Sequence, residues 1–290
     1  MAVLAATVCW ASAGVLAKKA NLPGTVLALW RLVIVVAVFA VIAIVTRRRL
    51  SLNMFRRSLP GGVLFGLNLA VWFTALEHAS VGIATVTAAL TPVMAMFAGW
   101  RFLGETITRL AIGCAAGAIG GVTLFVVPGF SASGTTTAGL LLALSTMVIW
   151  VCYLFVTKKA REGVGTIEYL LCMSIVAVIC LIPVVAIVND DGLRPPTHGW
   201  GWLVGLALVP GCLGHGLLTW AQPKVDLSVA SVLLQGEPVG AAIAGAVVLG
   251  ERVGLLQGLG LVVAFVALAV LSRQTAAQPA PAADVLAAAA

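Results

Sequence analysis

Charged residues are scarce in this 290-residue sequence. Asp, Glu, Lys and Arg together make up 9% of it, and only ten residues are acidic. A soluble domain carries about 25% charged residues, because its surface must be hydrated. The chain therefore lacks the polar surface that would keep a globule in water, and the composition argues against the soluble classes of enzyme and binding protein.

Several catalytic and ligand-binding motifs are also missing. The sequence has no Gly-Lys-Ser/Thr phosphate loop, which argues against ATP-driven pumping by this chain alone. It has no His-Glu-x-x-His zinc motif and no Gly-x-Ser-x-Gly nucleophile turn. Its six cysteines fall inside apolar runs without metal-ligand spacing. We therefore expect no catalytic residues, no metal and no cofactor.

Apolar residues dominate instead, at 61% of the sequence and a mean hydropathy of +1.13. A helix needs about 20 apolar residues to cross a bilayer. Lipid-exposed backbone must satisfy its own hydrogen bonds, so spans are helices or a closed barrel, and long unbroken apolar runs exclude the barrel. We predict an all-α membrane protein with about ten transmembrane helices. The predicted spans are about Ala2–Ala17, Thr25–Val45, Gly61–Leu76, Gly82–Trp100, Thr108–Val127, Thr137–Val156, Thr166–Val188, Trp200–Trp220, Ser228–Leu249 and Gly254–Leu271.

The net charge of +7 would suggest a nucleic-acid partner in a soluble protein, but here the basic residues cluster between apolar runs. With the N-terminus in the cytoplasm, twelve of the 17 Lys and Arg residues fall in inside loops and four in outside loops, while Arg31 lies within a span. Because positive charge marks cytoplasmic loops, both termini are predicted to be cytoplasmic. No nucleic-acid partner is expected.

An internal repeat links the two halves of the chain. Trp10, followed by Lys18-Lys19, recurs as Trp150, followed by Lys158-Lys159, at an offset of 140 residues. Further along, 11 of 30 positions match between residues 81–110 and the segment 146 residues later. The landmarks of this second block are Thr91-Pro92 and Gly104-Glu105 in the first copy and Glu237-Pro238 and Gly250-Glu251 in the second.

The repeated blocks resemble the EamA domain of the drug/metabolite transporter superfamily. The first copy does so over residues 84–93 (ATVTAALTPV) and 103–105 (LGE), the second over residues 230–239 (ASVLLQGEPV) and 249–251 (LGE). Trp10-Ala11-Ser12 resembles the family's opening element. The resemblance implies a permease of the bacterial inner membrane, commonly an exporter of amino acids or other metabolites, with a cavity between its halves. The predicted units are 1–128 and 137–272, each a five-helix repeat, and a disordered cytoplasmic tail, 273–290.

Two halves with five spans each cross the membrane in opposite directions, as in many secondary transporters. We therefore predict an exporter of a small metabolite, such as an amino acid, that works by alternating access and has proton coupling as an option. Its expected partners are a small-molecule substrate and membrane lipid. A channel-like or non-transporting membrane scaffold stays open as an alternative, as does an intramembrane enzyme acting on a lipid-linked substrate.

Glu237 is the sharpest candidate for function, because a carboxylate near the bilayer midplane is costly and should face a cavity or carry a proton. It could couple proton movement to transport or contact a substrate amine, or it could be a neutral carboxyl within the helix packing. Its counterpart in the first copy is Thr91. Arg31 could bind a substrate carboxylate or extend outward to the membrane interface.

The remaining cavity candidates are aromatic and polar. Aromatic walls suit metabolites with apolar side chains or flat rings, whereas a tryptophan at a span end fits the interfacial belt equally well. Asn68 and Trp72 share one helix face by their i, i+4 spacing. The full set of predicted cavity residues is Trp10, Arg31, Asn68, Trp72, Thr91, Trp150, Tyr153, His215, Gln235 and Glu237.

Two prolines and two glutamates complete the candidates. Pro92 and Pro238 each free a carbonyl four residues earlier, and serve as hinges or as static bends. Glu105 and Glu251 follow Gly in tight turns and are expected to cap the helix that comes next in the chain, with substrate contact as the alternative. Glycines at spacings of four, which permit close helix packing, are Gly113, Gly117 and Gly121, and Gly236 and Gly240.

Overall fold

The computed structural model describes residues 1–78, 87–127, 136–188, 193–249 and 254–277. Within these ranges every regular element is a helix and none is a strand. Seven stretches of this described part are long and apolar enough to cross a membrane. The predicted all-α membrane class is therefore correct. The seven stretches are Ala2–Ala20, Gly24–Val45, Arg109–Val126, Thr137–Arg161, Thr166–Val188, Trp200–Lys224 and Leu255–Arg273.

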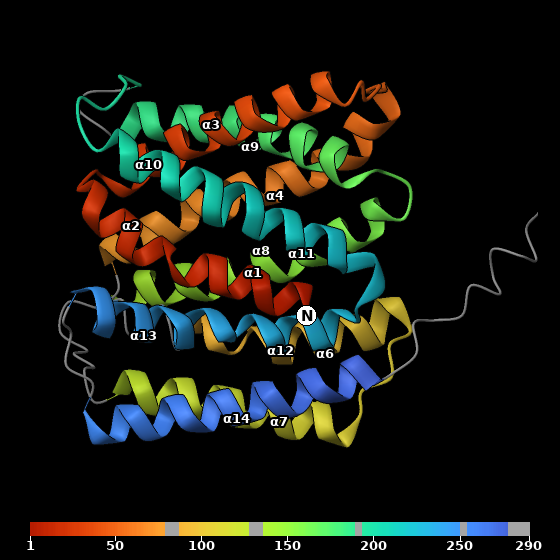
Figure 1. Cartoon of the computed structure of the whole chain (residues 1–290), viewed down its shortest axis with the longest axis vertical. Helices are drawn as coiled ribbons and strands as arrows, with labels where there is room; N and C mark the ends of the chain where they lie inside the picture. Colours follow the sequence, from red (N-terminus) through yellow and green to blue (C-terminus); the bar gives the residue numbers. More distant parts are fainter. Residues whose placement is uncertain (79–86, 128–135, 189–192, 250–253, 278–290) are drawn as a thin grey trace, which may run out of the picture.

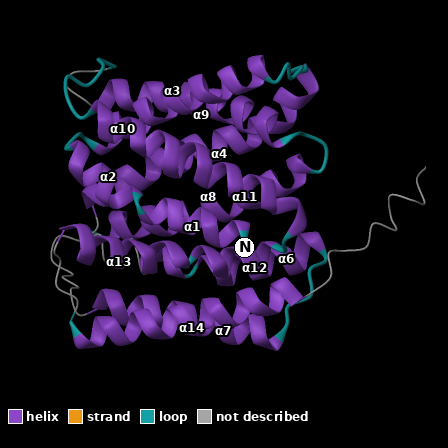
Figure 2. Ribbon diagram, viewed as in Figure 1, coloured by secondary structure: helices purple, strands orange, loops and turns teal. Residues whose placement is uncertain are grey.

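The helices lie side by side and run back and forth across the molecule (Figures 1 and 2). The pair α3 and α9 forms one edge and the pair α7 and α14 the other, with α1, α8 and α11 between them. The start of α1 and the end of α14 both lie toward the right of Figure 1. The bounds are α1 Ala2–Ala11, α2 Ala13–Ala20, α3 Gly24–Val45, α4 Leu52–His78, α6 Thr91–Leu103, α7 Arg109–Val126, α8 Thr137–Arg161, α9 Thr166–Val188, α10 Trp200–Leu206, a π-helix Ala207–Gly214, α11 His215–Ala221, a 3₁₀ turn Gln222–Lys224, α12 Leu227–Leu234, α13 Gly236–Leu249 and α14 Leu255–Ala277.

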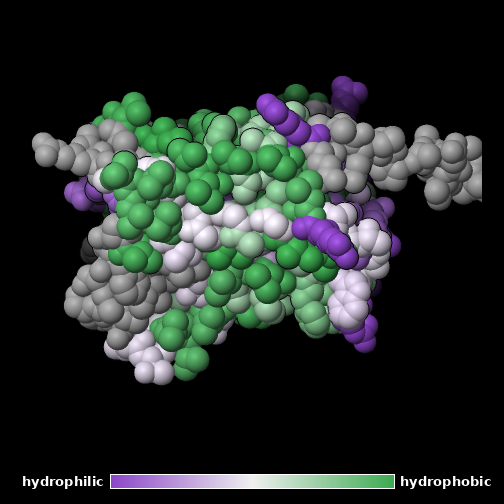
Figure 3. Space-filling model, turned by 90° about the horizontal axis from the view of Figure 1, so that it is seen from below, coloured by the Kyte–Doolittle hydropathy of each residue, from purple (hydrophilic) through white to green (hydrophobic). Residues whose placement is uncertain are grey.

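The outer surface is apolar across its middle. Seen from below, hydrophobic residues cover most of the centre of the face, and hydrophilic residues gather mainly at the right of the view (Figure 3). Large apolar side chains on α13 and α14 are mostly exposed, with Val247 at 79%, Leu255 at 86% and Phe265 at 63%. Exposed apolar area on this scale is unfavourable in water and favourable against lipid tails.

Three predicted spans contain irregular backbone. The first span breaks at Ser12, whose hydroxyl donates to the carbonyl of Cys9 at 2.7 Å and so competes with the helical hydrogen bond. The predicted span Trp200–Trp220 contains the π-helix, which includes Pro210. Proline has no amide to donate, and π-helical turns are a common way to absorb the missing bond.

The third break separates α12 from α13 at Gln235, inside the predicted span Ser228–Leu249. Pro238 explains it, because the proline ring clashes with the carbonyl of Leu234, the last residue of α12. Residues 87–89 are helical, and the turn at Leu90 separates them from α6. Pro92 lies in the first turn of α6, where a proline is tolerated. At the repeat offset of 146 residues, the two breaks fall within one residue of equivalent positions.

Other predicted boundaries shift slightly. The span predicted at Gly61–Leu76 lies inside the longer α4, and α14 continues to Ala277, beyond the predicted start of the tail at Arg273. The rest of the predicted tail, residues 278–290, lies outside the described residues, as do residues 82–86 of the predicted span Gly82–Trp100.

Close packing of α7 on α14 depends on glycine. A Cβ atom on Gly121 would lie 2.6 Å from the carbonyl oxygen of Gly260 and 2.6 Å from the amide of Ala264, and a Cβ on Gly117 would lie 3.2 Å from that of Ala267. Small residues let two helix backbones approach in this way.

Gly121→Ala should lower the thermal stability of the purified protein, because the new methyl group meets backbone that has little freedom to move. Overpacking of this kind costs about 1–3 kcal/mol. Gly120→Ala is the matched control, since a Cβ there has nothing within 4 Å. Unfolding is measured in detergent with a dye that reacts with the buried thiols Cys114 and Cys172. Equal unfolding temperatures for the two variants would contradict the proposed packing role of Gly121.

Candidate functional site

Five aromatic rings form a closed ring of contacts in the middle of the bundle. Trp10 lies 4.7 Å from His215 and 5.9 Å from Trp150, measured between ring centroids. Trp150 stacks on Tyr153 at 5.0 Å. Phe65 closes the circuit, 5.2 Å from Tyr153 and 5.0 Å from His215. Helices α1, α4, α8 and α11, which are distant in sequence, supply these rings.

The position of Trp10 is fixed by the π-helix. Its indole N–H donates to the carbonyl oxygen of Pro210 at 3.0 Å, and the residue is 6% exposed. Gly214 packs against the same ring, because a Cβ there would lie 2.6 Å from two of its atoms. Trp10 is therefore an interior residue and does not belong to an interfacial belt. Trp100, Trp200, Trp202 and Trp220, in contrast, are 40–59% exposed, as a belt requires.

A pair of opposite charges is linked to the aromatic ring through His215. Arg31 on α3 interacts electrostatically with both Glu237 and His215. Arg31 and Glu237 are not among the described ion pairs. The Nε atom of Arg31 and the Nδ1 atom of His215 are buried and have no hydrogen-bond partner among the described residues. Arg31 therefore points into the protein instead of extending to the interface, and it retains capacity to bind an anion.

The fold also helps to accommodate Glu237. It lies in the first turn of α13, directly after the break at Gln235. Helix N-termini carry partial positive charge and favour a nearby carboxylate. The equivalent position in the repeat, Thr91, begins α6 after the other break. Thr91 and Glu237, which occupy equivalent repeat positions but differ in charge, thus each lie at the start of a helix.

Three predicted cavity residues bind backbone carbonyls instead of lining the aromatic site with free polar groups. Asn68 donates to the carbonyl oxygen of Thr146 at 2.9 Å, joining α4 to α8. The Thr91 hydroxyl donates to the carbonyl of Ala88 at 2.6 Å, which is the carbonyl that Pro92 leaves free. Gln235 donates to the carbonyl of Ala89 at 3.3 Å.

The structure therefore brings together six of the predicted cavity residues, which are Trp10, Arg31, Trp150, Tyr153, His215 and Glu237. Trp72 is half-buried on α4 and has no place in the described ring contacts. Phe65 was missed, and its only signal was its position one helical turn before Asn68.

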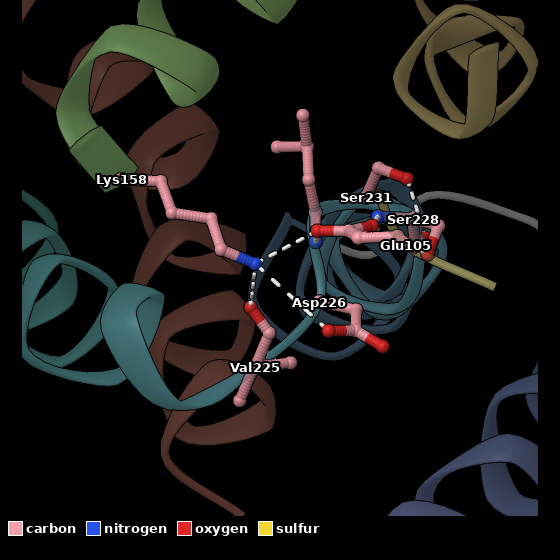
Figure 4. A network of polar contacts seen from close by, with 7 residues as sticks. Glu105, Lys158, Val225, Asp226, Ser228 and Ser231 are labelled. Atoms are coloured by element: carbon pink, nitrogen blue, oxygen red, sulfur yellow. Dashed lines mark hydrogen bonds and ion pairs between the residues drawn. The ribbon is translucent and has the colours of Figure 1, made fainter. Parts of the chain in front are cut away.

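A second polar cluster surrounds Glu105 at one end of the bundle (Figure 4). Oε1 of Glu105 accepts from Lys158 Nζ at 2.7 Å and from the amide of Leu227 at 2.6 Å. Oε2 accepts from the amide and the hydroxyl of Ser228 at 3.1 and 3.0 Å. Gly104 makes the turn that carries Glu105, with φ of 68°.

Glu105 thus caps the N-terminus of α12. The sequence predicted that it would cap the next helix in the chain, so that prediction was wrong in its target. That next helix, α7, is capped by Thr108, which accepts from the amide of Ala111. Burial raises the pKa of Glu105, but hydrogen bonds from Lys158, Leu227 and Ser228 outweigh it and leave the pKa below its ordinary value. The equivalent Glu251 lies outside the described residues.

Gly214→Ala should displace Trp10 and disturb the aromatic ring, because its methyl group overlaps the indole. We expect the near-UV circular dichroism that arises from coupled aromatic rings to fall as far as it does in Trp10→Phe. Gly216→Ala is the control, since a Cβ there has nothing within 4 Å. A wild-type spectrum for Gly214→Ala would show that the indole does not depend on this glycine.

Comparison with known proteins identifies the family. Two segments of the chain, residues 1–127 and 137–273, match the EamA-like transporter family. A protein of Streptantibioticus cattleyicolor named "Probable terminal-alkyne amino-acid exporter" is 29% identical over 154 residues, and the match spans 53% of this chain and 50% of that protein, about half the length of each. A solved crystal structure with 18% sequence identity shares the fold, with a TM-score of 0.78 over 94% of this chain and 96% of the other. The chain is a multi-pass membrane protein, and it belongs to the EamA-like transporter family.

Proposed function

We propose that the chain is a secondary transporter of the bacterial inner membrane that exports a small amino acid-like zwitterion. The observation that carries the proposal is the pair of opposite charges, Arg31 and Glu237, of which Arg31 also interacts with His215 in the ring of five aromatic side chains. The substrate carboxylate binds Arg31, its ammonium group binds Glu237, and its side chain lies against the aromatic rings. The name of the Streptantibioticus cattleyicolor relative agrees with this substrate class.

The unpaired state of the two charges supports a substrate between them. A buried arginine and a buried carboxylate normally satisfy each other, because an isolated buried charge is costly. Arg31 and Glu237 interact without forming a described ion pair, and Arg31 Nε keeps a free hydrogen-bonding position. A zwitterion with its own carboxylate and ammonium groups neutralises both residues at once, whereas a simple cation or anion leaves one charge without a partner.

Alternating access between two inverted five-helix halves is the proposed mechanism, with ten spans in all. Residues of equivalent repeat position meet each other twice, at Trp10 with Trp150 and at Ala89 with Gln235. Equivalent residues touch only where a pseudo-two-fold axis passes between them, so these contacts support an inverted arrangement. Interrupted helices at corresponding positions of two halves are also typical of transporter binding sites.

Orientation and energy source complete the proposal. The basic end of α8, with Lys158, Lys159 and Arg161, faces the cytoplasm together with both termini. Protons drive export through Glu237, which exchanges a proton for the substrate ammonium group. Pro92 and Pro238 flank the two breaks and act as hinges.

Glu237→Gln should lose accumulation driven by an imposed pH gradient but keep counterflow of labelled substrate in proteoliposomes at a raised substrate concentration, because the amide oxygen still accepts from the substrate ammonium group without the ionic attraction. The amide keeps the shape of the side chain but cannot bind or release a proton. Glu162→Gln, an exposed carboxylate at the end of α8, is the matched control and should behave as wild type. Wild-type accumulation by Glu237→Gln would refute proton coupling through this residue.

Arg31 is tested by pairing a variant with a substrate analogue. Wild-type protein should bind phenylalanine about tenfold or more tightly than phenethylamine, which lacks the carboxylate, because a charge-assisted hydrogen bond contributes about 1.5–3 kcal/mol. Arg31→Gln should bind the two compounds equally. If Arg31→Gln keeps the wild-type preference, the carboxylate binds elsewhere.

The dependence of flux on substrate concentration distinguishes a carrier from a channel. Flux through a carrier saturates as the substrate concentration rises, whereas flux through a channel continues to rise.

A further inference from the structure

We propose that Glu105 and Asp226 are exchangeable N-caps of α12, and that the exchange between them releases the two family segments from each other at this end of the protein. Glu105 belongs to the first segment, 1–127, while Asp226, Lys158 and α12 belong to the second, 137–273. The inference rests on the proposed transport cycle, in which the halves must separate at one end and then at the other.

The present cap of α12 comes from outside its own segment. Asp226 occupies the N-cap position, with extended backbone, and aspartate at this position normally accepts from the second or third amide of its helix, here Ser228 or Val229. Here its side chain makes no cap hydrogen bond. Glu105 accepts from the amides of Leu227 and Ser228 instead, across 122 and 123 residues of sequence. A good capping residue is therefore in place but not in use.

The site that holds Glu105 is built closely around the carboxylate. A Cβ on Gly99 would lie 2.4 Å from Oε2 of Glu105, so only glycine leaves room for it. The Glu105 amide donates to the Gly99 carbonyl at 3.1 Å, which fixes the turn. Glu105 is 8% exposed, and every described partner of its carboxylate lies in the second segment.

Lys158 makes the exchange electrostatically possible. Its ammonium group lies 2.7 Å from Glu105 Oε1 and 4.0 Å from Asp226 Oδ1, and it also donates to the carbonyl of Val225 at 2.9 Å. Figure 4 shows Lys158 directed between the two carboxylates. When the first segment withdraws Glu105, Asp226 can neutralise Lys158 and cap α12, because both belong to its own segment. No buried charge is then left without a partner.

The pKa of Asp226 fits a carboxylate that can cap α12 but does not cap it while Glu105 is bound. Burial and the neighbouring Glu105 raise its pKa, while Lys158 opposes the shift. Departure of Glu105 removes the repulsion between the two carboxylates, so the capping state of Asp226 becomes more favourable when the segments separate.

The exchange can be measured at the α12 amides by hydrogen–deuterium exchange with residue-level fragmentation, on the full chain in nanodiscs without substrate. In Glu105→Gln, we expect the amide of Ser228 to exchange about tenfold faster, because Asp226 then caps it in competition with the glutamine side chain that remains in the site. Asp226→Ala should match wild type. The double variant should exchange about tenfold faster again, because no cap remains. Glu162→Gln is the control for removal of a carboxylate at this end.

Two outcomes overturn the inference. If Asp226→Ala alone exchanges as fast as the double variant, Asp226 already caps α12 beside Glu105. If the double variant exchanges no faster than Glu105→Gln, Asp226 never takes over. Gly99→Ala provides a second route to the same state, because its methyl group displaces the carboxylate without removing it, and it should reproduce the exchange pattern of Glu105→Gln.

Counterflow separates this inference from the proposed function. Asp226→Ala should slow substrate counterflow about tenfold without a change in apparent affinity, because the released state then lacks a cap. Normal counterflow by Asp226→Ala refutes the exchange but leaves the transporter intact. Absence of zwitterion flux in the wild-type protein refutes the proposed function, whereas the amide exchange pattern, measured without substrate, still decides between the two caps.

Discussion

Lipid provides no hydrogen-bond partner for a peptide group, and this constraint shapes the helix breaks that the structure describes. A helix can break inside a membrane only where protein groups replace the lost backbone bonds. Thr91 satisfies the freed carbonyl of Ala88, and Gln235 that of Ala89. Trp10 binds the carbonyl of Pro210 in the π-helix, and Glu105 binds the first amides of α12. Side chains thus maintain the breaks that a functional site requires.

The helix breaks also explain where a charged residue can be placed. A broken helix presents a new N-terminus, whose partial charge favours an anion. Glu237 begins α13 at such a point, and Thr91 begins α6 at the equivalent one. If the two halves were identical, both starts would carry the same charge. Their difference gives the centre of the protein a polarity, with a carboxylate on one half and Arg31 on the other.

Hydropathy predicted the helical membrane class, because burial in lipid leaves a strong signal in composition, and the resemblance of the repeated blocks to the EamA domain indicated the family. Six of the ten predicted cavity residues are brought together by the structure. The sequence patterns did not predict how polar side chains are used. Asn68, Thr91 and Gln235 have the chemistry of substrate ligands, yet each donates to a carbonyl. Which carbonyls need a partner depends on how the chain packs, and no local pattern records that.

The target of Glu105 illustrates the same limit over a longer distance. A Gly-Glu turn predicts a cap, and the nearest helix in the chain was the natural expectation. Thr108 already caps α7, so the carboxylate of Glu105 is free to reach another helix. The identity of that helix depends on contacts between residues more than 120 positions apart. Phe65 was missed for the same reason, since its role comes from rings on α8 and α11.

Helix α12 connects the two polar sites. Its N-terminus donates to the carboxylate of Glu105, which also accepts from Lys158. Its C-terminus ends at the break that precedes Glu237. Eight residues of helix span about 12 Å. In the proposed transport cycle, α12 moves as a rigid body, so one movement shifts both the break before Glu237 and the end that Glu105 holds. Under that proposal, substrate or proton binding at the centre and release of the segments at the end are two consequences of one helix movement, and no separate chain of contacts between the two sites is needed.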